Sequence, residues 1–375
     1  MKYRILLVSE IPPVPAEKYG SGGLMSTYML LNYLRNYFDI HILTNMSVYD
    51  TSSFNLKEFK LHNVKVQKIP KVGFINNLIE INRFRNELSI LLESIRPDII
   101  MSNTHLISSC VDVASRHNIK SVVWIRSYEN FYLSEELKYM KSKYKKIDFI
   151  IKKVLFRNKD YRAIRKASFV LVNSIYMKNV VDKEFGVHSE VVYPPISCDS
   201  YLTIKPSDVK VVGFLKPEVK KGIDIVIEIA RRMPNIEFLC YGEKPVNYEK
   251  ISSELNNLHF VGWINDHKKI FSSIRILIVP SIWEEPFGRV VIEALASGVL
   301  PIVSNRGGLP EAVGDKLLIV GDNWNIDAWV KKIQLYLENG DAFEKAIRVG
   351  KEHIKKFSIE NQGKNMKIYL ENVCS

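Results

Sequence analysis

The stretch EEPFGRVVIEALASGVLPIVSNRGGLPE, residues 284–311, combines acids, glycines and the start of a helix within one short segment. Glu285 and Glu293 stand eight residues apart, and the chain turns at Gly288 before it continues with a helical pattern. A second glycine turn, Gly307-Gly308, follows a short apolar run that is typical of a buried strand. The alternation of turn, helix, strand and turn predicts one unit of a parallel α/β sheet.

The same alternation extends along the whole chain. In the first half we predict strands at 4–8, 40–44, 64–69, 98–102, 121–125 and 169–173, with helices between them such as 24–37 and 76–95. In the second half we predict strands at 211–214, 237–241, 259–261, 276–279 and 301–304. Continuous Val/Ile runs between helices indicate an α/β protein with two Rossmann-like, doubly wound parallel-sheet domains facing an interdomain cleft. Ligands of such sheets bind in the loops that follow the strands.

The proline-containing segment 191–208, VVYPPISCDSYLTIKPSD, separates the two halves. A chain of 375 residues exceeds the roughly 250–300 residues that a single hydrophobic core supports. We therefore predict one domain over 1–196 and a second over 205–356. A last helix over 357–373 is expected to pack back onto the first domain.

The composition is that of a soluble globular protein, with 46% hydrophobic and 25% charged residues. The first apolar run, Ile5 to Val8, is too short for a signal peptide, and no run is long enough to span a bilayer. The four cysteines are isolated and lack metal-ligand spacing, so we expect free thiols in a reducing compartment. These features together predict a cytoplasmic protein.

The loop before the predicted helix 289–297 has the features of an anion site. Gly288 permits close backbone approach, and the unpaired N–H groups and positive dipole end of a helix start suit a phosphate. Glu285 and Glu293 would instead accept hydrogen bonds from sugar hydroxyls, as from a ribose. An amphipathic core helix with two exposed acids is the alternative, and for Glu293 alone the two interpretations are about equal.

Three further loops follow predicted strands. A Lys-Gly pair beginning at Lys221 opens a helix, and its ammonium group would neutralise a diphosphate as a point charge. Gly22 and Gly23 precede a helix after the first strand, where a flexible loop is the alternative because a lone glycine pair is a weak signal. His105 lies in another such loop and is a candidate ligand contact, although surface histidines are commoner.

The segment 210–322 resembles the donor-binding half of retaining GT-B glycosyltransferases of family 4, also called glycosyltransferase group 1. Their pattern is E-P-F-G, four residues, E-A, a small-residue turn, G-x-P and G-G-x-x-E. The matching residues here are Glu285-Pro286-Phe287-Gly288, Glu293-Ala294, Gly298, Pro301 (one residue late) and Gly307-Gly308-Leu309-Pro310-Glu311. The first half matches weakly, through the early glycine pair and the order of strands and helices.

The resemblance implies roles for particular residues. Glu285 would contact hydroxyls of the donor sugar, Glu293 the ribose, and Lys221 the diphosphate. The implied donor-binding residues are Gly22, Gly23, Lys216, Lys220, Trp263, Ile264, Phe287, Gly288, Arg289, Glu293, Gly307 and Gly308. The candidate catalytic residues are Glu285, Lys221, Arg126 and His105.

The implied reaction moves a hexose from a UDP- or GDP-linked sugar to a saccharide or lipid-linked acceptor, with retention of anomeric configuration. Such a reaction would serve cell-surface polysaccharide or glycolipid synthesis. The chain contains no Asp-x-Asp sequence, so we expect no metal and no cofactor besides the nucleotide sugar itself. Lysines, arginines and helix amides would then stabilise the leaving diphosphate.

Two positions depart from the family pattern. Phe214 stands where the family often has an arginine, whose charge would then come from Lys216, Lys220, Arg289 or Arg306. Arg126 stands where the family often has a histidine; arginine cannot act as a base, although it could bind phosphate or an anionic acceptor. These departures keep open a sugar-nucleotide-binding protein or partner subunit without turnover. An epimerase or a phosphorylase of the same fold is a third, less favoured hypothesis.

The segment from Arg126 to Lys166 carries thirteen lysines and arginines against five acids, a local net charge of +8 within a chain of net charge +12. Apolar residues alternate with these charges. Docking on an anionic lipid surface, which would place the protein on the inner face of the plasma membrane, is one interpretation. A solvated helix face that covers the core is the other. No recognised nucleic-acid motif accompanies the charge, so we expect no nucleic-acid partner.

Overall fold

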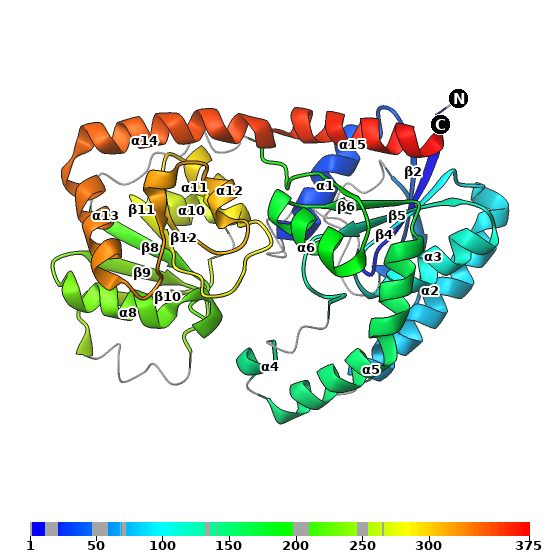
Figure 1. Cartoon of the computed structure of the whole chain (residues 1–375), viewed down its shortest axis with the longest axis horizontal. Helices are drawn as coiled ribbons and strands as arrows, with labels where there is room; N and C mark the ends of the chain where they lie inside the picture. Colours follow the sequence, from blue (N-terminus) through cyan, green and yellow to red (C-terminus); the bar gives the residue numbers. More distant parts are fainter. Residues whose placement is uncertain are drawn as a thin grey trace. The chain divides into compact units, whose positions relative to one another are not determined.

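The computed structural model describes residues 2–11, 22–46, 59–67, 69, 73–131, 136–140, 142–197, 210–245, 254–264 and 266–375. Within these residues the chain forms two compact α/β units, each built around one parallel sheet (Figure 1). The main part of the first unit ends at Pro195, and Ile359–Ser375 also belongs to this unit. Ile196–Ser358 belongs to the second unit. The predicted fold class is confirmed for both halves.

The first unit has a seven-stranded sheet in the order β3-β2-β1-β4-β5-β6-β7. Its strands are β1 (Arg4–Val8), β2 (Asp39–Thr44), β3 (Lys60–Asn63), β4 (Ile99–Ser102), β5 (Lys120–Ile125), β6 (Phe169–Val172) and β7 (Ser189–Val191). Its helices are α1 (Gly22–Leu34), α2 (Gly73–Ile95), η5 (Thr104–Leu106), α3 (Ile107–Arg116), α4 (Glu136–Tyr139), α5 (Lys143–Lys166), α6 (Ile175–Phe185) and α15 (Ile359–Cys374). The order reverses between β1 and β4, which is where open parallel sheets bind ligands.

The third strand corrects the sequence prediction. We expected a strand at 64–69, but β3 is Lys60–Asn63, in register with β2 from His41–Lys60 to Thr44–Asn63. Val64 is buried and its N–H donates to the Thr44 carbonyl at 2.9 Å. Because β2 ends at Thr44, the apolar residues that follow have no strand left to pair with. The polar edge strand KLHN lacked the Val/Ile signal that marks a central strand.

The second unit has a six-stranded sheet in the order β10-β9-β8-β11-β12-β13, with its reversal between β8 and β11. Its strands are β8 (Val211–Leu215), β9 (Glu237–Tyr241), β10 (Leu258–Gly262), β11 (Ile276–Val279), β12 (Leu300–Ser304) and β13 (Ile319–Val320). Its helices are η6 (Val219–Lys221), α8 (Ile223–Arg232), α10 (His267–Ser272), α11 (Arg289–Ala296), α12 (Leu309–Val313), η8 (Lys316–Leu318), α13 (Ile326–Glu338), α14 (Gly340–His353) and η9 (Ile354–Phe357). The short edge strands β7 and β13 were not expected from the sequence.

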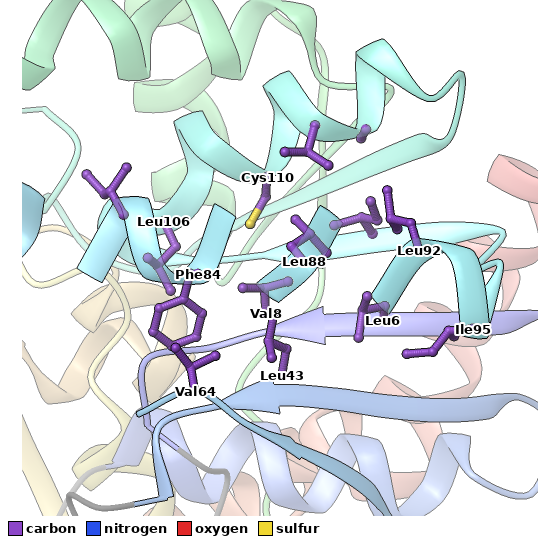
Figure 2. Packing of buried hydrophobic residues seen from close by; sticks show 14 of the residues in the cluster. Leu6, Val8, Leu43, Val64, Phe84, Leu88, Leu92, Ile95, Leu106 and Cys110 are labelled. Carbon is purple, nitrogen blue, oxygen red and sulfur yellow. The ribbon is translucent and has the colours of Figure 1, made fainter. Parts of the chain in front are cut away.

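The core of the first unit lies between the sheet and the helices α2 and α3 (Figure 2). Leu6 and Val8 of β1 face Phe84 and Leu88 of α2, and all four side chains are at most 1% exposed. Phe156 of α5 belongs to the same cluster, so the basic helix is fixed to this core by one face. Burial of such side chains is the main favourable term in folding.

The last helix packs within the first unit, on α1. Gly363 of α15 lies against the ring of Tyr33, and a Cβ at this position would approach that ring to 2.4 Å. Gln362 of the same helix accepts a hydrogen bond from the Tyr193 N–H at 2.9 Å. No helix among the described residues is both long and apolar enough to cross a membrane. Cys110, Cys240 and Cys374 are free thiols.

Candidate functional site

Three neighbouring strands of the second unit place their loops at the same sheet edge. The lysine loop 216–222 follows β8, the loop 280–288 follows β11, and the loop 305–308 follows β12. The first two are joined through one backbone carbonyl, because the Lys220 oxygen accepts from the N–H groups of Ile282 and Trp283, each at 3.1 Å. A parallel sheet therefore brings together residues that are far apart in the sequence.

The glycine pair 307–308 is required for the close approach of two loops. A Cβ on Gly307, whose φ is +55°, would lie 2.1 Å from the Glu285 carbonyl oxygen. The Gly308 N–H donates to that same oxygen at 2.7 Å, and the Gly307 N–H donates to a carboxylate oxygen of Glu284 at 2.6 Å. Both amides are thus used within the protein. The donor-binding role that we predicted for this pair stays a prediction.

Glu285 is 9% exposed and its carboxylate has two partners within the unit. The Lys221 ammonium group donates to Oε1, and the Ser281 hydroxyl donates to the same oxygen at 2.8 Å. The ammonium group neutralises the buried carboxylate, and the hydroxyl fixes its orientation. Gly222, next in sequence, could not carry a side chain because a Cβ would lie 2.1 Å from the Pro280 carbonyl oxygen. The structure therefore pairs two of the candidate catalytic residues, Lys221 and Glu285.

Two further lysines stand in the same loop. Lys216 adopts a left-handed backbone conformation with φ of +58°. Partial desolvation of its ammonium group, together with the neighbouring charge of Lys221, lowers the pKa of Lys216, although the residue as a whole is exposed. Lys220 lies 3.4 Å from a carboxylate oxygen of Glu218, at the exposed side of the loop. Phe214, at the position where an arginine was expected, is 2% exposed and belongs to the core, so it supplies nothing to this loop.

Glu293 lies on α11 and is 3% exposed, with both carboxylate oxygens bonded to basic side chains. Arg289 Nε donates to Oε1 at 2.6 Å, and His267 Nδ1 lies 2.9 Å from Oε2. Burial alone would raise the pKa of Glu293, but the Arg289 and His267 charges outweigh it and hold the pKa at about 2. Burial lowers the pKa of His267, but its hydrogen bond and charge interaction with Glu293 raise it overall.

His267 was missed by the sequence analysis. It begins α10, where Asp266 caps the helix by accepting the Lys268 N–H at 2.9 Å, and the strand β11 separates it from Glu293 in the sequence. A histidine at the start of the first helix after β10 was the available signal, because helix starts after strands lie at the ligand-binding edge.

The remaining residues predicted to bind the donor lie at the end of β10 and just before α11. Trp263, directly after β10, is 66% exposed, and Ile264 beside it is half-buried. Phe287 is 2% exposed, and its ring packs edge-on against Phe357 with centroids 5.2 Å apart. Only the backbone of Phe287 is thus available to a ligand. Gly288, with φ of +100°, is the residue before the first turn of α11.

The first unit contains its own cavity of about 770 Å³. It opens at the sheet reversal and is lined by residues that follow β1, β4 and β5, including Gly23, His105 and Arg126. His105 Nε2 lies 3.0 Å from a carboxylate oxygen of Glu80, which is 1% exposed, and its Nδ1 lies 3.8 Å from Glu10. The donor atoms of these three side chains lie within 4.8 Å of one another and could hold a divalent cation.

Arg126 is fixed in this wall by contacts to the start of α1. Its guanidinium donates to the Gly23 carbonyl and to the Thr27 hydroxyl, both at 2.7 Å, and it lies 4.5 Å above the Trp124 ring. Burial lowers the pKa of Arg126 to about 10, so the side chain keeps its charge at neutral pH. Gly22 and Gly23 form the first turn of α1, and the Gly22 carbonyl accepts from the Ser26 hydroxyl at 2.7 Å.

The two sheets and their reversals define a GT-B fold. Among solved structures, the chain is similar to a sucrose-phosphate synthase from Thermosynechococcus elongatus, with a TM-score of 0.76, 18% identity and 99% of each chain covered. It is also similar to HepE of Anabaena in complex with UDP, with a TM-score of 0.72, 17% identity, and 99% of this chain and 100% of that chain covered.

Residues 204–355 match the model of the family described as glycosyl transferases group 1. One curated relative is an uncharacterized 42.6 kDa protein in the cps region of Klebsiella pneumoniae, 23% identical over 256 residues. That match covers 63% of this chain and 65% of the relative. The matches to the relatives next in similarity span 37–61% of those proteins' lengths.

Proposed function

We propose that this protein is a glycosyltransferase that moves a hexose from a UDP- or GDP-linked sugar to a saccharide or lipid-linked acceptor, with retention of anomeric configuration. The observation that carries the proposal is the pair of buried carboxylates in the second unit, each held by basic side chains. Glu285 is paired with Lys221, and Glu293 with Arg289 and His267. The family of residues 204–355 supports the same reaction class.

The pair Lys221–Glu285 would serve two parts of one donor. In the free protein the ammonium group neutralises the carboxylate. With a nucleotide sugar bound, the ammonium group faces the diphosphate, whose negative charge grows as the glycosidic bond breaks. The carboxylate accepts hydrogen bonds from sugar hydroxyls, held in orientation by Ser281. Lys216 and Lys220 add positive charge in the same loop.

Glu293 is suited to a ribose because its carboxylate keeps acceptor capacity. An ionised carboxylate offers about four acceptor positions. Arg289 and His267 use one on each oxygen, which leaves capacity for the two hydroxyls of a ribose. The exposed ring of Trp263, at the end of β10 in the same unit, offers an apolar surface to the base.

The cavity of the first unit is the proposed place of the acceptor. Its walls carry polar and charged groups, including Arg126 and the His105–Glu80 pair. Such groups bind hydroxyls through hydrogen bonds. Since the donor diphosphate is neutralised by side chains, we propose transfer without a metal at the donor site, in cell-surface polysaccharide or glycolipid synthesis.

The test is a transfer assay with a panel of UDP- and GDP-sugars and candidate saccharide and lipid-linked acceptors, each with and without EDTA. We expect acceptor-dependent release of one nucleoside diphosphate, unchanged by EDTA, and a product whose anomeric proton coupling matches that of the donor. An inverted product would contradict the retaining mechanism, and loss of activity in EDTA would contradict metal independence. Tight nucleotide binding without turnover on any acceptor would favour the non-catalytic binding protein, which the buried Phe214 motivates.

A further inference from the structure

Helix α5 has two apolar faces on opposite sides. Phe156 is 2% exposed and packs in the core of the first unit. On the other side Tyr144, Ile147, Ile150 and Val154 recur three and four residues apart and are 44%, 59%, 49% and 75% exposed. At about 100° per residue these four side chains form one stripe along the helix, here called the α5 stripe. A helix that only covers a core would be polar on that side.

The α5 stripe is held in its outward direction by contacts with the start of α2. Asp148 accepts the Phe74 N–H at 2.6 Å, and the Tyr144 hydroxyl accepts the Gly73 N–H at 3.0 Å. Lys152 lies 3.0 Å from the other oxygen of Asp148. Rotation of α5 to bury the stripe would break these contacts and leave the α2 N-terminus without partners. The exposed apolar surface is therefore a fixed feature of the unit.

Basic residues border the stripe. The lysines and arginines of α5 are Lys143, Lys145, Lys146, Lys152, Lys153, Arg157, Lys159, Arg162, Arg165 and Lys166. Its two acids are Asp148, which bonds α2 and Lys152, and Asp160, which is 1% exposed. The solvent-facing surface of this helix is thus apolar along its first half and strongly basic at its sides and along its second half.

We propose that the α5 stripe and its flanking lysines dock the first unit on a lipid bilayer surface that contains anionic lipid. Apolar side chains on one helix face insert at the headgroup boundary, while basic side chains beside them reach the lipid phosphates. Neither half of this pattern suffices alone. A polyanion such as nucleic acid would bind the lysines without using Ile147 or Val154, and an apolar protein partner would not need ten cations.

The docking face lies close to the cavity of the first unit. Phe149 and Lys152, on the same turns of α5, line that cavity. A helix with its side chains is about 10 Å across, so the cavity would lie within roughly one helix diameter of the lipid surface. This favours a lipid-linked acceptor over a free saccharide. That last step rests on the proposed function, whereas the docking itself does not.

The experiment measures co-sedimentation of the full chain with vesicles of phosphatidylcholine alone and of phosphatidylcholine mixed with phosphatidylglycerol. We expect binding to the anionic vesicles only, weakening as salt is added. The triple change Lys143→Glu, Lys146→Glu and Lys153→Glu should weaken partitioning by about 100-fold or more. The same charge change at the exposed residues Lys331, Lys345 and Lys351 of the second unit is the matched control and should have little effect.

The apolar half of the proposal has its own variant. Ile147→Ser, Ile150→Ser and Val154→Ser together should weaken binding by about tenfold or more. Ile90, Ile175 and Val349, which are 65%, 52% and 45% exposed, allow the same three changes elsewhere on the surface as a control. Full binding by the stripe variant, with binding lost only in the lysine variant, would overturn the proposal in favour of a simple polyanion site.

A second readout does not depend on loss of binding. In Ile147→Trp, brominated lipid in the anionic vesicles should quench the added tryptophan fluorescence, whereas Ile90→Trp should show no added quenching. Equal quenching at both positions, or no binding of the wild type to any vesicle, would contradict the proposal. Transfer activity on a water-soluble acceptor, measured in parallel, separates a failure of docking from a failure of the proposed function.

Discussion

The carboxyl edges of the two sheets differ in how their charged groups are assembled. In the second unit Glu285 and Glu293 come from one segment of sequence, and each is neutralised by basic side chains. In the first unit Glu10, Glu80 and His105 come from three distant segments and meet only in the folded protein. The arrangement in the second unit is therefore visible as a motif in the sequence, whereas the arrangement in the first unit is visible only as isolated residues. We infer that donor chemistry is concentrated in the second unit and acceptor handling in the first.

The largest effect should come from Glu285→Gln. The amide keeps the size of the side chain but loses the charge that pairs with Lys221 and that we propose accepts hydrogen bonds from sugar hydroxyls. We expect kcat to fall on the order of 100-fold with a smaller change in nucleotide affinity, measured by steady-state kinetics and by titration with the nucleoside diphosphate. Glu344→Gln, an exposed change on α14, is the control. Wild-type turnover in Glu285→Gln would remove the sugar contact from the account.

The next effect concerns the loop contact at Gly307. Gly307→Ala adds a Cβ at 2.1 Å from a backbone oxygen in a left-handed conformation, so the variant should lose about 2 kcal/mol or more of stability. Gly321→Ala in the same unit meets no atom within 4 Å and should be nearly neutral. Urea unfolding of the two variants makes the comparison. Equal stability would mean that the loops do not need this close approach.

A smaller effect should distinguish the role of the first unit from that of the second. His105→Ala removes the partner of Glu80 in the first-unit cavity, and we expect transfer to fall about tenfold or more while nucleotide affinity stays at its wild-type value. His188→Ala, which removes an exposed histidine paired with Glu190, is the control. A His105→Ala variant that binds nucleotide more weakly would show that the division of roles between the units is wrong.

The smallest effect is the pH dependence of the His267–Glu293 pair. The pKa of His267 is raised in the folded protein, so its contribution to stability is complete below its ordinary pKa of about 6.5 and is lost as the pH rises. The stability difference between wild type and His267→Gln should therefore shrink with rising pH. Burial lowers the pKa of His353, so the difference for His353→Gln should change in the opposite direction. Urea unfolding at pH values below and above about 6.5 measures how each stability difference changes with pH and so distinguishes the two variants.

Much of the fold could be predicted from the sequence, because buried parallel strands are continuous apolar runs. β1, β4 and β12 are such runs, and their positions were predicted closely. The edge strand β3 was placed wrongly, since its polar residues are paired only because β2 extends that far. Tertiary pairing, and not local composition, decides where an edge strand ends.

In the candidate site, too, the features set by local sequence could be predicted, and those set by tertiary contacts could not. The glycines and acids of 284–311 could be found because their order is local. His267 could not be assigned to Glu293, since the contact depends on how α10 and α11 pack. The structural role of Gly307 could not be predicted either. The sequence does not distinguish a glycine that permits two loops to contact each other from one that admits a phosphate.

The most direct test of the central claim is thermal unfolding of wild type and Glu293→Ala with UDP, GDP, ADP and TDP. At a hundred times its dissociation constant, the preferred nucleotide should stabilise the wild type by about 2.7 kcal/mol, a shift of several degrees. We predict such a shift with one nucleotide, unchanged by EDTA and lost in Glu293→Ala. A shift of the same size in Glu293→Ala, or no shift with any nucleotide, would contradict a donor site in the second unit.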